Sequence, residues 1–136
     1  MISKPKISII GAGNVGASAA YRALELDLAD VVLLDIVEGL PQGKALDMTQ
    51  MLSVTGISSS VIGTNDYSDT KDSDVVIITS GLARKPGMSR DDLISTNTKI
   101  IKEVTQQVVK FSPNTIIVVV TNPLDAMTYV AHKVSG

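Results

Sequence analysis

The chain has 136 residues, of which 44% are hydrophobic, and its 12 basic and 14 acidic side chains give a formal net charge of −2. This length suits a single domain with a hydrophobic core, and the balanced charge argues against proteins that bind nucleic acids or anionic membrane surfaces. The lack of cysteine excludes disulfides, thiolate zinc sites and a cysteine nucleophile, and no apolar run approaches the roughly 20 residues of a membrane span. We therefore expect one cytoplasmic domain without a metal centre.

Short β-branched runs alternate with longer stretches of helical periodicity. The runs predict strands at residues 6–10, 31–36, 60–64, 75–79 and 115–120. The stretches predict helices at residues 14–26, 40–52, 89–111 and 124–134, and the polar residues 66–74 predict a loop or one helical turn. Most of the strands are continuously apolar, which is typical of strands covered by helices on both faces.

The alternation of strands and helices predicts parallel pairing through right-handed crossovers. We expect an α/β fold with a doubly wound parallel sheet, in which the five strands lie in the order 3-2-1-4-5. All of residues 1–136 belong to this one domain, because no linker or repeat interrupts them. A ligand crevice is expected where the strand order reverses, beside strands 1 and 4.

A glycine-rich loop directly follows the first predicted strand. Its sequence is Gly11-Ala12-Gly13-Asn14-Val15-Gly16, a G-x-G-x-x-G pattern. Gly11 suits a tight turn, Gly13 the close approach of a pyrophosphate to the backbone, and Gly16 close packing of helix on strand. The following helix would direct free N–H groups toward the phosphates. Glycines with this spacing also occur in ordinary tight turns, so the motif alone leaves that interpretation open.

An acidic residue follows the second predicted strand at the spacing of a dinucleotide site. Asp35 stands 19 residues after Gly16, where a carboxylate would accept hydrogen bonds from an adenosine ribose. The same carboxylate would repel a 2′-phosphate, which favours NAD over NADP. The alternative is a solvated carboxylate at the end of a strand.

Two of the three arginines lie close together after the fourth predicted strand, in the segment GLARKPGMSR. Arg84 and Arg90 offer rigid bidentate forks for carboxylates, which indicates a small anionic substrate. The Pro and Gly of the segment suit a loop that closes over a ligand. The alternative is a solvated basic loop in which Arg90 pairs with Asp91 or Asp92.

Two asparagines are further candidates. Asn122, after the fifth predicted strand, could present its amide to the nicotinamide ribose or to the substrate, or the Asn-Pro pair could simply end a strand and begin a helix. Asn97 is a polar group in the mostly apolar stripe of the long helix. Its alternative is a partly exposed helical amide.

Taken together, GAGNVG, Asp35, SGLARKPGMSRDDL and VTNPLDAMTY closely resemble NAD-dependent malate dehydrogenases of the lactate-dehydrogenase-like type, over essentially the whole chain. The resemblance implies a Rossmann domain, NAD as cofactor and malate or oxaloacetate as substrate. It implies NAD contacts at Gly11, Ala12, Gly13, Asn14, Val15, Gly16, Asp35, Asn97, Val120, Thr121 and Asn122.

The same resemblance assigns substrate roles. Arg84 matches the position that selects a dicarboxylate, where lactate-specific relatives carry glutamine, and Arg90 matches the catalytic arginine that polarises the reacting carbonyl. Asn122 matches a group that contacts cofactor and substrate, and its bond to Pro123 is cis by resemblance. The chemistry agrees, because oxaloacetate carries two carboxylates and hydride transfer builds negative charge on its carbonyl oxygen.

Part of the family's machinery is not in this sequence. The family needs a further arginine for the C1 carboxylate and a histidine–aspartate pair for proton transfer, whereas His132 is the only histidine here and matches no catalytic position. We expect His132 to interact with a helix C-terminus. The sequence thus predicts the NAD-binding half, with the sixth strand and second domain missing, inactive on its own, and with residues 115–120 as an exposed apolar edge. The full-length relatives are dimers or tetramers.

Other functions remain open. One alternative is a stand-alone NAD-binding sensor, and another is a lactate or other 2-hydroxyacid dehydrogenase, which Arg84 disfavours. A short-chain dehydrogenase needs Tyr-x-x-x-Lys, and both Tyr67 with Lys71 and Tyr129 with Lys133 fit this spacing. That interpretation leaves the two loop arginines and Asn122 unexplained.

Overall fold

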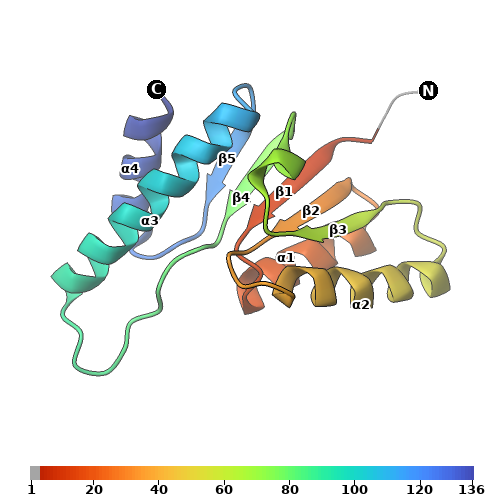
Figure 1. Cartoon of the computed structure of the whole chain (residues 1–136), viewed down its shortest axis with the longest axis horizontal. Helices are drawn as coiled ribbons and strands as arrows, with labels where there is room; N and C mark the ends of the chain where they lie inside the picture. The colour runs from red at the N-terminus through yellow and green to blue at the C-terminus, as the bar shows by residue number, and fades with distance from the viewer. Residues whose placement is uncertain (1–3) are drawn as a thin grey trace.

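The computed structural model describes residues 4–136. Strands β1 (Lys6–Ile10), β2 (Asp30–Leu34), β3 (Val61–Thr64), β4 (Val75–Ile78) and β5 (Ile116–Val119) form one sheet. The helices are α1 (Asn14–Glu25), α2 (Leu40–Thr55), α3 (Arg90–Phe111) and α4 (Leu124–Ser135), with a 3-10 turn, η1 (Tyr67–Thr70). Figure 1 shows α1 and α2 packed beside β1–β3, and α3 and α4 side by side near β4 and β5.

The sheet is parallel throughout and has the order β3-β2-β1-β4-β5, which confirms the predicted topology. Ile9 pairs with Leu33 of β2 on one side and with Ile77 of β4 on the other. The strand order reverses between β1 and β4: strands β2 and β3 lie on one side of β1, whereas β4 and β5 lie on the other. The carboxyl ends of these two strands therefore lie next to each other, with the loops that follow them on the same edge.

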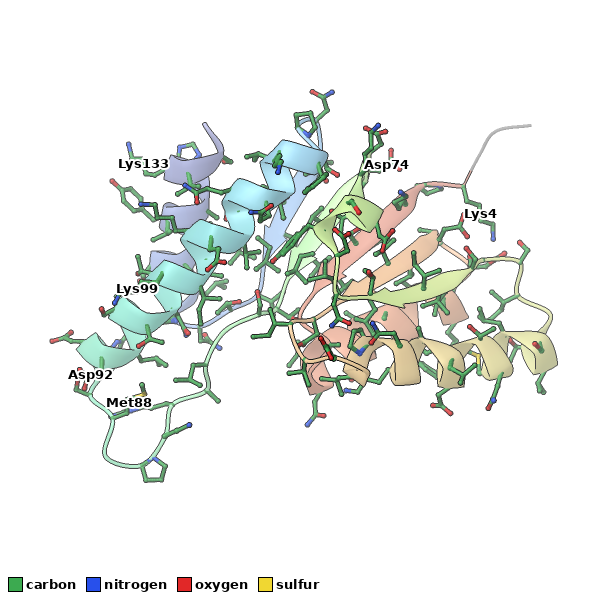
Figure 2. All side chains as sticks on the ribbon, viewed as in Figure 1. Lys4, Asp74, Met88, Asp92, Lys99 and Lys133 are labelled. Atoms are coloured by element: carbon green, nitrogen blue, oxygen red, sulfur yellow. The ribbon has the colours of Figure 1, made fainter. Side chains whose placement is uncertain are left out.

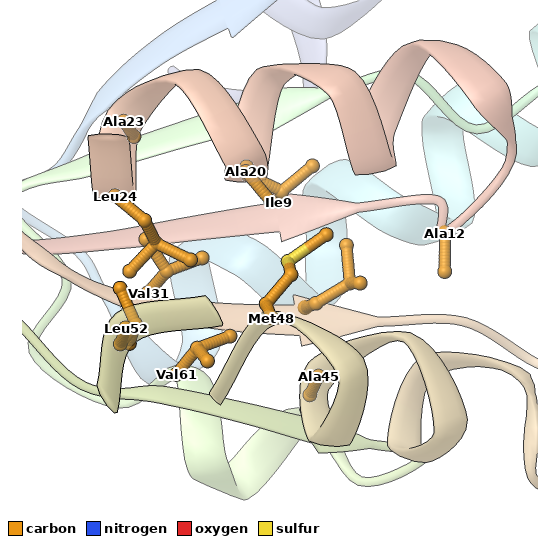
Figure 3. Close-up of a cluster of buried hydrophobic side chains, with 11 residues drawn as sticks. Ile9, Ala12, Ala20, Ala23, Leu24, Val31, Ala45, Met48, Leu52 and Val61 are labelled. Atoms are coloured by element: carbon orange, nitrogen blue, oxygen red, sulfur yellow. The ribbon is translucent and has the colours of Figure 1, made fainter. Parts of the chain in front are cut away.

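The central strands are buried on both faces by helices. Successive side chains of a strand point to opposite faces of the sheet, so each strand contributes to two apolar clusters. Ile9 and Leu33 pack with the helices α1 and α2, in the cluster that Figure 3 shows around Leu24 and Met48. The next residues, such as Ile10, join the other cluster with α3 and α4. Burial of each large apolar side chain contributes roughly 1.5–3 kcal/mol, so both helix layers are held firmly to the sheet.

Strand β5, at one edge of the sheet, is apolar and exposes every second side chain, as predicted for this edge. Ile116 is 66% exposed and Val118 is 42% exposed. Within residues 4–136 the sheet has five strands, and β5 pairs only with β4. No helix in this part of the chain is long and apolar enough to cross a membrane.

Some predicted boundaries are wrong by one to three residues. The strand predicted at 31–36 ends at Leu34, and Ile36 is 89% exposed beyond it. Helix α2 continues past the predicted end at residue 52 to Thr55, because Gly56, with φ +69°, supplies the left-handed residue that ends it. The turn predicted within residues 66–74 is confirmed by η1.

Candidate functional site

The reversal of strand order creates a groove of about 450 Å³ at the carboxyl ends of β1, β2 and β4. Its lining includes Gly11 and Gly13 of the glycine-rich loop, Asp35 after β2, and Ser80 and Leu82 after β4. Predicted dinucleotide-binding residues of two separate segments, the glycine-rich loop and Asp35, thus meet at one place, beside residues that follow β4.

Two glycines of the loop are required by the protein itself. Gly11 has φ +111°, and a Cβ on it would lie 2.7 Å from Thr79 Oγ1. A Cβ on Gly16 would lie 1.8 Å from the main-chain oxygen of Gly11, so only glycine allows α1 to approach β1 this closely. A Cβ on Gly13, in contrast, would meet no atom of the described residues within 4 Å. Gly13 therefore faces open space, which leaves room for a ligand to approach the backbone.

The N-terminus of α1 has the features of an anion site. Gly13 is its N-cap and supplies no side-chain hydrogen bond, and the first turn contains no acidic residue. The first N–H groups of a helix lack intrahelical acceptors, and together with the helix dipole they favour a negatively charged group. The open space at Gly13 and the uncapped helix end fit a pyrophosphate, so the residues present suit a dinucleotide.

Asp35 connects the end of β2 to the glycine-rich loop. Its Oδ2 accepts the Ala12 N–H at 2.7 Å and its Oδ1 accepts the Val37 N–H at 3.0 Å. It is half-buried at the groove, rather than a freely solvated carboxylate. Each carboxylate oxygen has a second lone pair, so Asp35 can still accept hydrogen bonds from ribose hydroxyls.

Two side chains that the sequence analysis missed hold the carbonyl oxygens of the same loop. Lys44 Nζ lies 2.6 Å from the Ala12 oxygen and 3.4 Å from the Gly13 oxygen, and Thr79 Oγ1 lies 3.0 Å from the Gly11 oxygen. Thr79 could have been found from its place at the carboxyl end of β4. No local pattern marks Lys44, because its contact joins residues 32 positions apart.

A second cavity, of about 610 Å³, gathers the predicted substrate residues. Arg84, Arg90 and Asn122 line it together with Leu93 and residues 123–125. Both arginines are exposed, and among residues 4–136 neither forms an ion pair. The alternative in which Arg90 pairs with its acidic neighbours is therefore not what the structure has, and both guanidinium groups keep their charge available for an anion.

The loop that carries the arginines projects from the sheet between β4 and α3 (Figure 1). Arg84 Nε donates to the Met88 oxygen at 3.1 Å, which folds the loop back on itself. Arg90 is the first residue of α3, and a capping box of Ser89 and Asp92 fixes this helix end. The hydrogen bonds from Ser89 also lower the pKa of Asp92. Figure 2 shows Met88 in this loop and Asp92 at the adjoining start of α3.

Asn97 is fully buried, so the alternative of a partly exposed helical amide is wrong. Its Oδ1 accepts the Leu82 N–H at 2.8 Å, and its Nδ2 donates to the Leu82 oxygen at 3.2 Å and to the Asn122 oxygen at 2.8 Å. Both N–H donors of the amide are used inside the protein. A direct contact of Asn97 with NAD stays a prediction.

The segment after β5 packs closely on the segment after β4. Thr121 is buried and its Oγ1 donates to the Ser80 oxygen at 2.7 Å, while a Cβ on Gly81 would lie 2.4 Å from Thr121 Cγ2. The bond between Asn122 and Pro123 is cis, as the resemblance implies. Val120 is 39% exposed at the end of β5. Contacts of Val120 and Thr121 with NAD also stay predictions.

The remaining titratable candidates lie elsewhere. His132 is in the last turn of α4, eight residues or about 12 Å along the helix from Leu124 at the cavity. Among residues 4–136, no three His, Cys, Asp or Glu side chains are grouped so that they could hold a metal ion.

Neither Tyr-x-x-x-Lys pair is placed as a catalytic pair. Lys133 Nζ lies 5.6 Å from the ring centroid of Tyr129 on the exposed side of α4. Burial, with Glu103 and Asp35 nearby, raises the pKa of Tyr67 to about 12. A catalytic tyrosine needs a pKa closer to the working pH, so both observations argue against the short-chain dehydrogenase alternative.

Comparison with known proteins agrees with this geometry. Residues 5–136 match the family described as lactate/malate dehydrogenase, NAD binding domain. A malate dehydrogenase of Heliobacterium modesticaldum is 60% identical over 135 residues, which are 99% of this chain and 44% of that protein. The chain therefore spans less than half the length of the curated relatives it matches.

Solved structures of malate dehydrogenases and of lactate dehydrogenases are both similar to this chain. The apo malate dehydrogenase of Picrophilus torridus has a TM-score of 0.95 at 45% identity, over 98% of this chain and 43% of that one. The lactate dehydrogenase of Cryptosporidium parvum, solved with lactic acid and NAD, has a TM-score of 0.93 at 48% identity, over 100% of this chain and 43% of that one. With the family match over nearly its whole length, the chain belongs to the lactate/malate dehydrogenase family and forms its NAD-binding domain.

Proposed function

We propose that this chain is the cofactor-binding half of a malate dehydrogenase, which interconverts malate and NAD+ with oxaloacetate, NADH and a proton. One observation carries the choice of substrate: Arg84, Arg90 and Asn122 line a single cavity, and among residues 4–136 neither arginine has a carboxylate partner. If Arg90 polarises the reacting carbonyl, the unpaired guanidinium group of Arg84 is left for a carboxylate of its own, which favours a substrate with a second carboxylate over one with a single carboxylate.

The glycine-rich loop and Asp35 would hold the cofactor. The uncapped N–H groups at the start of α1 would bind the pyrophosphate, and the Asp35 carboxylate would accept hydrogen bonds from the adenosine ribose. The same carboxylate would disfavour a 2′-phosphate, so we propose NAD rather than NADP. When bound, NAD supplies the acceptor for the hydride that leaves malate.

The cavity residues would bind and polarise the substrate. Arg84 would pair with the distal carboxylate, and Arg90 would stabilise the negative charge that develops on the carbonyl oxygen. Asn122 lines the same cavity, and the hydrogen bond from Asn97 fixes its main chain against α3. It would therefore orient substrate against cofactor.

We propose that the 136-residue chain has no measurable turnover by itself. General acid–base catalysis contributes roughly 10²- to 10⁴-fold, and the one histidine of the sequence stands in the last turn of α4. The proton donor, the arginine for the C1 carboxylate and the contacts that make a dimer or tetramer would come from the rest of such an enzyme, and we propose the cytoplasm as its location. Malate oxidation by the purified chain at an ordinary dehydrogenase rate would overturn the proposed inactivity.

The test of cofactor and substrate uses the fluorescence of bound NADH. The chain should bind NADH, and oxaloacetate should change the signal of the complex at lower concentration than pyruvate does. Arg84→Gln should lower the ratio of the effective pyruvate concentration to the effective oxaloacetate concentration by about tenfold, because it deletes one charged bidentate contact. Lys85→Gln, which removes the neighbouring exposed charge, is the control.

Each alternative predicts a different result. A preference for pyruvate in the unmodified chain would favour a lactate-type dehydrogenase. NADH binding that neither keto acid alters, with no effect of Arg84→Gln or Arg90→Lys, would favour a sensor module. No NADH binding at all would overturn the proposal.

A further inference from the structure

Lys44 contacts the glycine-rich loop and has no part in the binding of cofactor and substrate proposed above. It lies on α2, yet its ammonium group reaches the glycine-rich loop and donates to the main-chain oxygens of Ala12 and Gly13, at 2.6 and 3.4 Å. The side chain is half-buried. It lines the groove between α1 and α2, beside Ala17 and Asp47, and is not among the residues that line the nucleotide groove. Lys44 therefore acts on the loop from behind, and not on a ligand directly.

The charge of Lys44 has no carboxylate partner in the described part of the chain. Among residues 4–136, the ion pairs are Lys4–Asp27 and Arg22–Glu25, so no acidic oxygen lies within 4.0 Å of Lys44. The start of α1 is itself the positive end of a helix and has no acidic residue in its first turn. Two positive features thus meet on one loop, an arrangement that is stabilised when an anion binds there.

The loop is arranged so that its acceptors are occupied and its donors are left for a ligand. Thr79 holds the Gly11 oxygen, Lys44 holds the oxygens of Ala12 and Gly13, and Asp35 takes the Ala12 N–H. Carbonyl oxygens carry partial negative charge, so a phosphate nearby is repelled by them unless donors neutralise them. The charged donor of Lys44 does this more strongly than a neutral one would.

We propose that Lys44 is a positioning residue for the cofactor: it fixes the carbonyl oxygens of Ala12 and Gly13 and adds positive charge beneath the pyrophosphate. This inference rests on the proposed NAD binding. It assigns to α2, the helix after the second strand, a share of the affinity for phosphate that the glycine motif alone does not provide.

The test compares Lys44→Met with Lys44→Arg in the 136-residue chain. Methionine keeps the apolar stem without the charge, whereas arginine keeps a charged donor. Lys44→Met should weaken NADH and ADP-ribose binding by about tenfold, which is about 1.4 kcal/mol, and Lys44→Arg should recover most of this loss. Lys99→Met is the matched control, because Lys99 is an exposed lysine on the outer side of α3, away from the glycine-rich loop (Figure 2).

Two further readouts separate positioning from general damage to the fold. Adenosine has no phosphate, so its binding should be the same in Lys44→Met as in the unmodified chain. The NADH affinity of Lys44→Met should also fall less steeply with salt, because one screened charge is gone. Equal loss of adenosine and ADP-ribose binding, or NADH affinity equal to that of the unmodified chain, would overturn the inference.

Failure of the proposed function gives a different pattern. If the unmodified chain binds no NADH, the proposed function fails, and Lys44 is judged from ¹⁵N relaxation of residues 11–16. Lys44→Met should then make this loop more mobile, while Lys99→Met should not. An unchanged loop in Lys44→Met would overturn the positioning role in that case too.

Discussion

Asn97 Nδ2 donates a hydrogen bond of 2.8 Å to the main-chain oxygen of Asn122, and so ties the start of α4 to the middle of α3. The same amide makes two further bonds to the main chain of Leu82, in the loop that carries the two arginines. One buried side chain therefore sets the relative position of the segments that carry Arg84 and Asn122. The candidate substrate cavity depends on this contact, although Asn97 is not among the residues that line it.

Asn97→Ala should lower the free energy of unfolding by roughly 1–3 kcal/mol, because it leaves the partly buried N–H of Leu82 and the carbonyl oxygens of Leu82 and Asn122 without their partner. Urea denaturation followed by circular dichroism measures this loss. Gln106→Ala, at an exposed position of the same helix, is the control and should change stability by no more than about 0.5 kcal/mol. Equal stability of the two variants would show that the amide is not structurally important.

The glycine-rich loop allows stability and binding to be separated with two variants. Gly16→Ala places a Cβ 1.8 Å from the Gly11 oxygen, so it should destabilise the fold by about 2–3 kcal/mol or more. A Cβ on Gly13 meets no atom of residues 4–136 within 4 Å, so Gly13→Ala should change stability by no more than about 1 kcal/mol, the cost of alanine at an N-cap. Gly13→Ala should nevertheless weaken NADH binding, because its methyl group occupies the space for the phosphates. Full NADH affinity in folded Gly13→Ala would contradict the assignment of that space.

The strand order and the place of the site could be predicted from sequence because their signals are local. Continuous apolar runs marked the buried strands, and the motifs around Gly11, Arg84 and Asn122 each follow a strand, so a parallel sheet had to bring them to one edge. Apolar runs do not mark where a strand ends, since residues such as Ile36 are apolar and yet lie exposed beyond β2.

The supporting contacts could not be predicted, because they join distant parts of the chain. Lys44 contacts a loop 32 residues away, and Asn97 contacts a residue 25 positions away. Lysine in a helix and asparagine in an apolar stripe have many possible roles. Only the packing of α2 against the glycine-rich loop, and of α3 against the end of β5, decides which role each one has.

Asp35→Asn should weaken NADH binding by about tenfold and reduce the discrimination against NADPH, because the amide has one acceptor oxygen fewer and no negative charge. The ratio of the dissociation constants for NADPH and NADH measures this. Asp30→Asn is a matched control at the other end of β2, since Asp30 also accepts two hydrogen bonds, from Ser60 N and Oγ at 2.7 and 2.8 Å. An unchanged ratio in Asp35→Asn would argue against ribose recognition by Asp35.

Asp27 is the acidic group that links stability most clearly to pH. Its carboxylate accepts hydrogen bonds from the Lys4 ammonium and from Ser59 N and Oγ, the latter two at 2.9 and 2.7 Å. The Lys4 contact, followed by that of Ser59, holds the pKa of Asp27 well below its usual value of 3.8. A carboxylate with a lowered pKa stabilises the fold above its unfolded pKa, and this contribution is lost as the pH falls through the folded pKa.

Asp27→Asn should therefore destabilise the chain at about pH 7, and the difference from the unmodified chain should shrink once the pH falls below 3.8. Asparagine is a clean replacement, because Asp27 has φ +51° and asparagine tolerates this left-handed conformation. Urea denaturation from about pH 7 down to about pH 2.5 measures the difference. Asp47→Asn, on the exposed side of α2, controls for loss of an exposed carboxylate. A difference that stays constant over the whole range would mean that Asp27 acts through packing, and not through its charge.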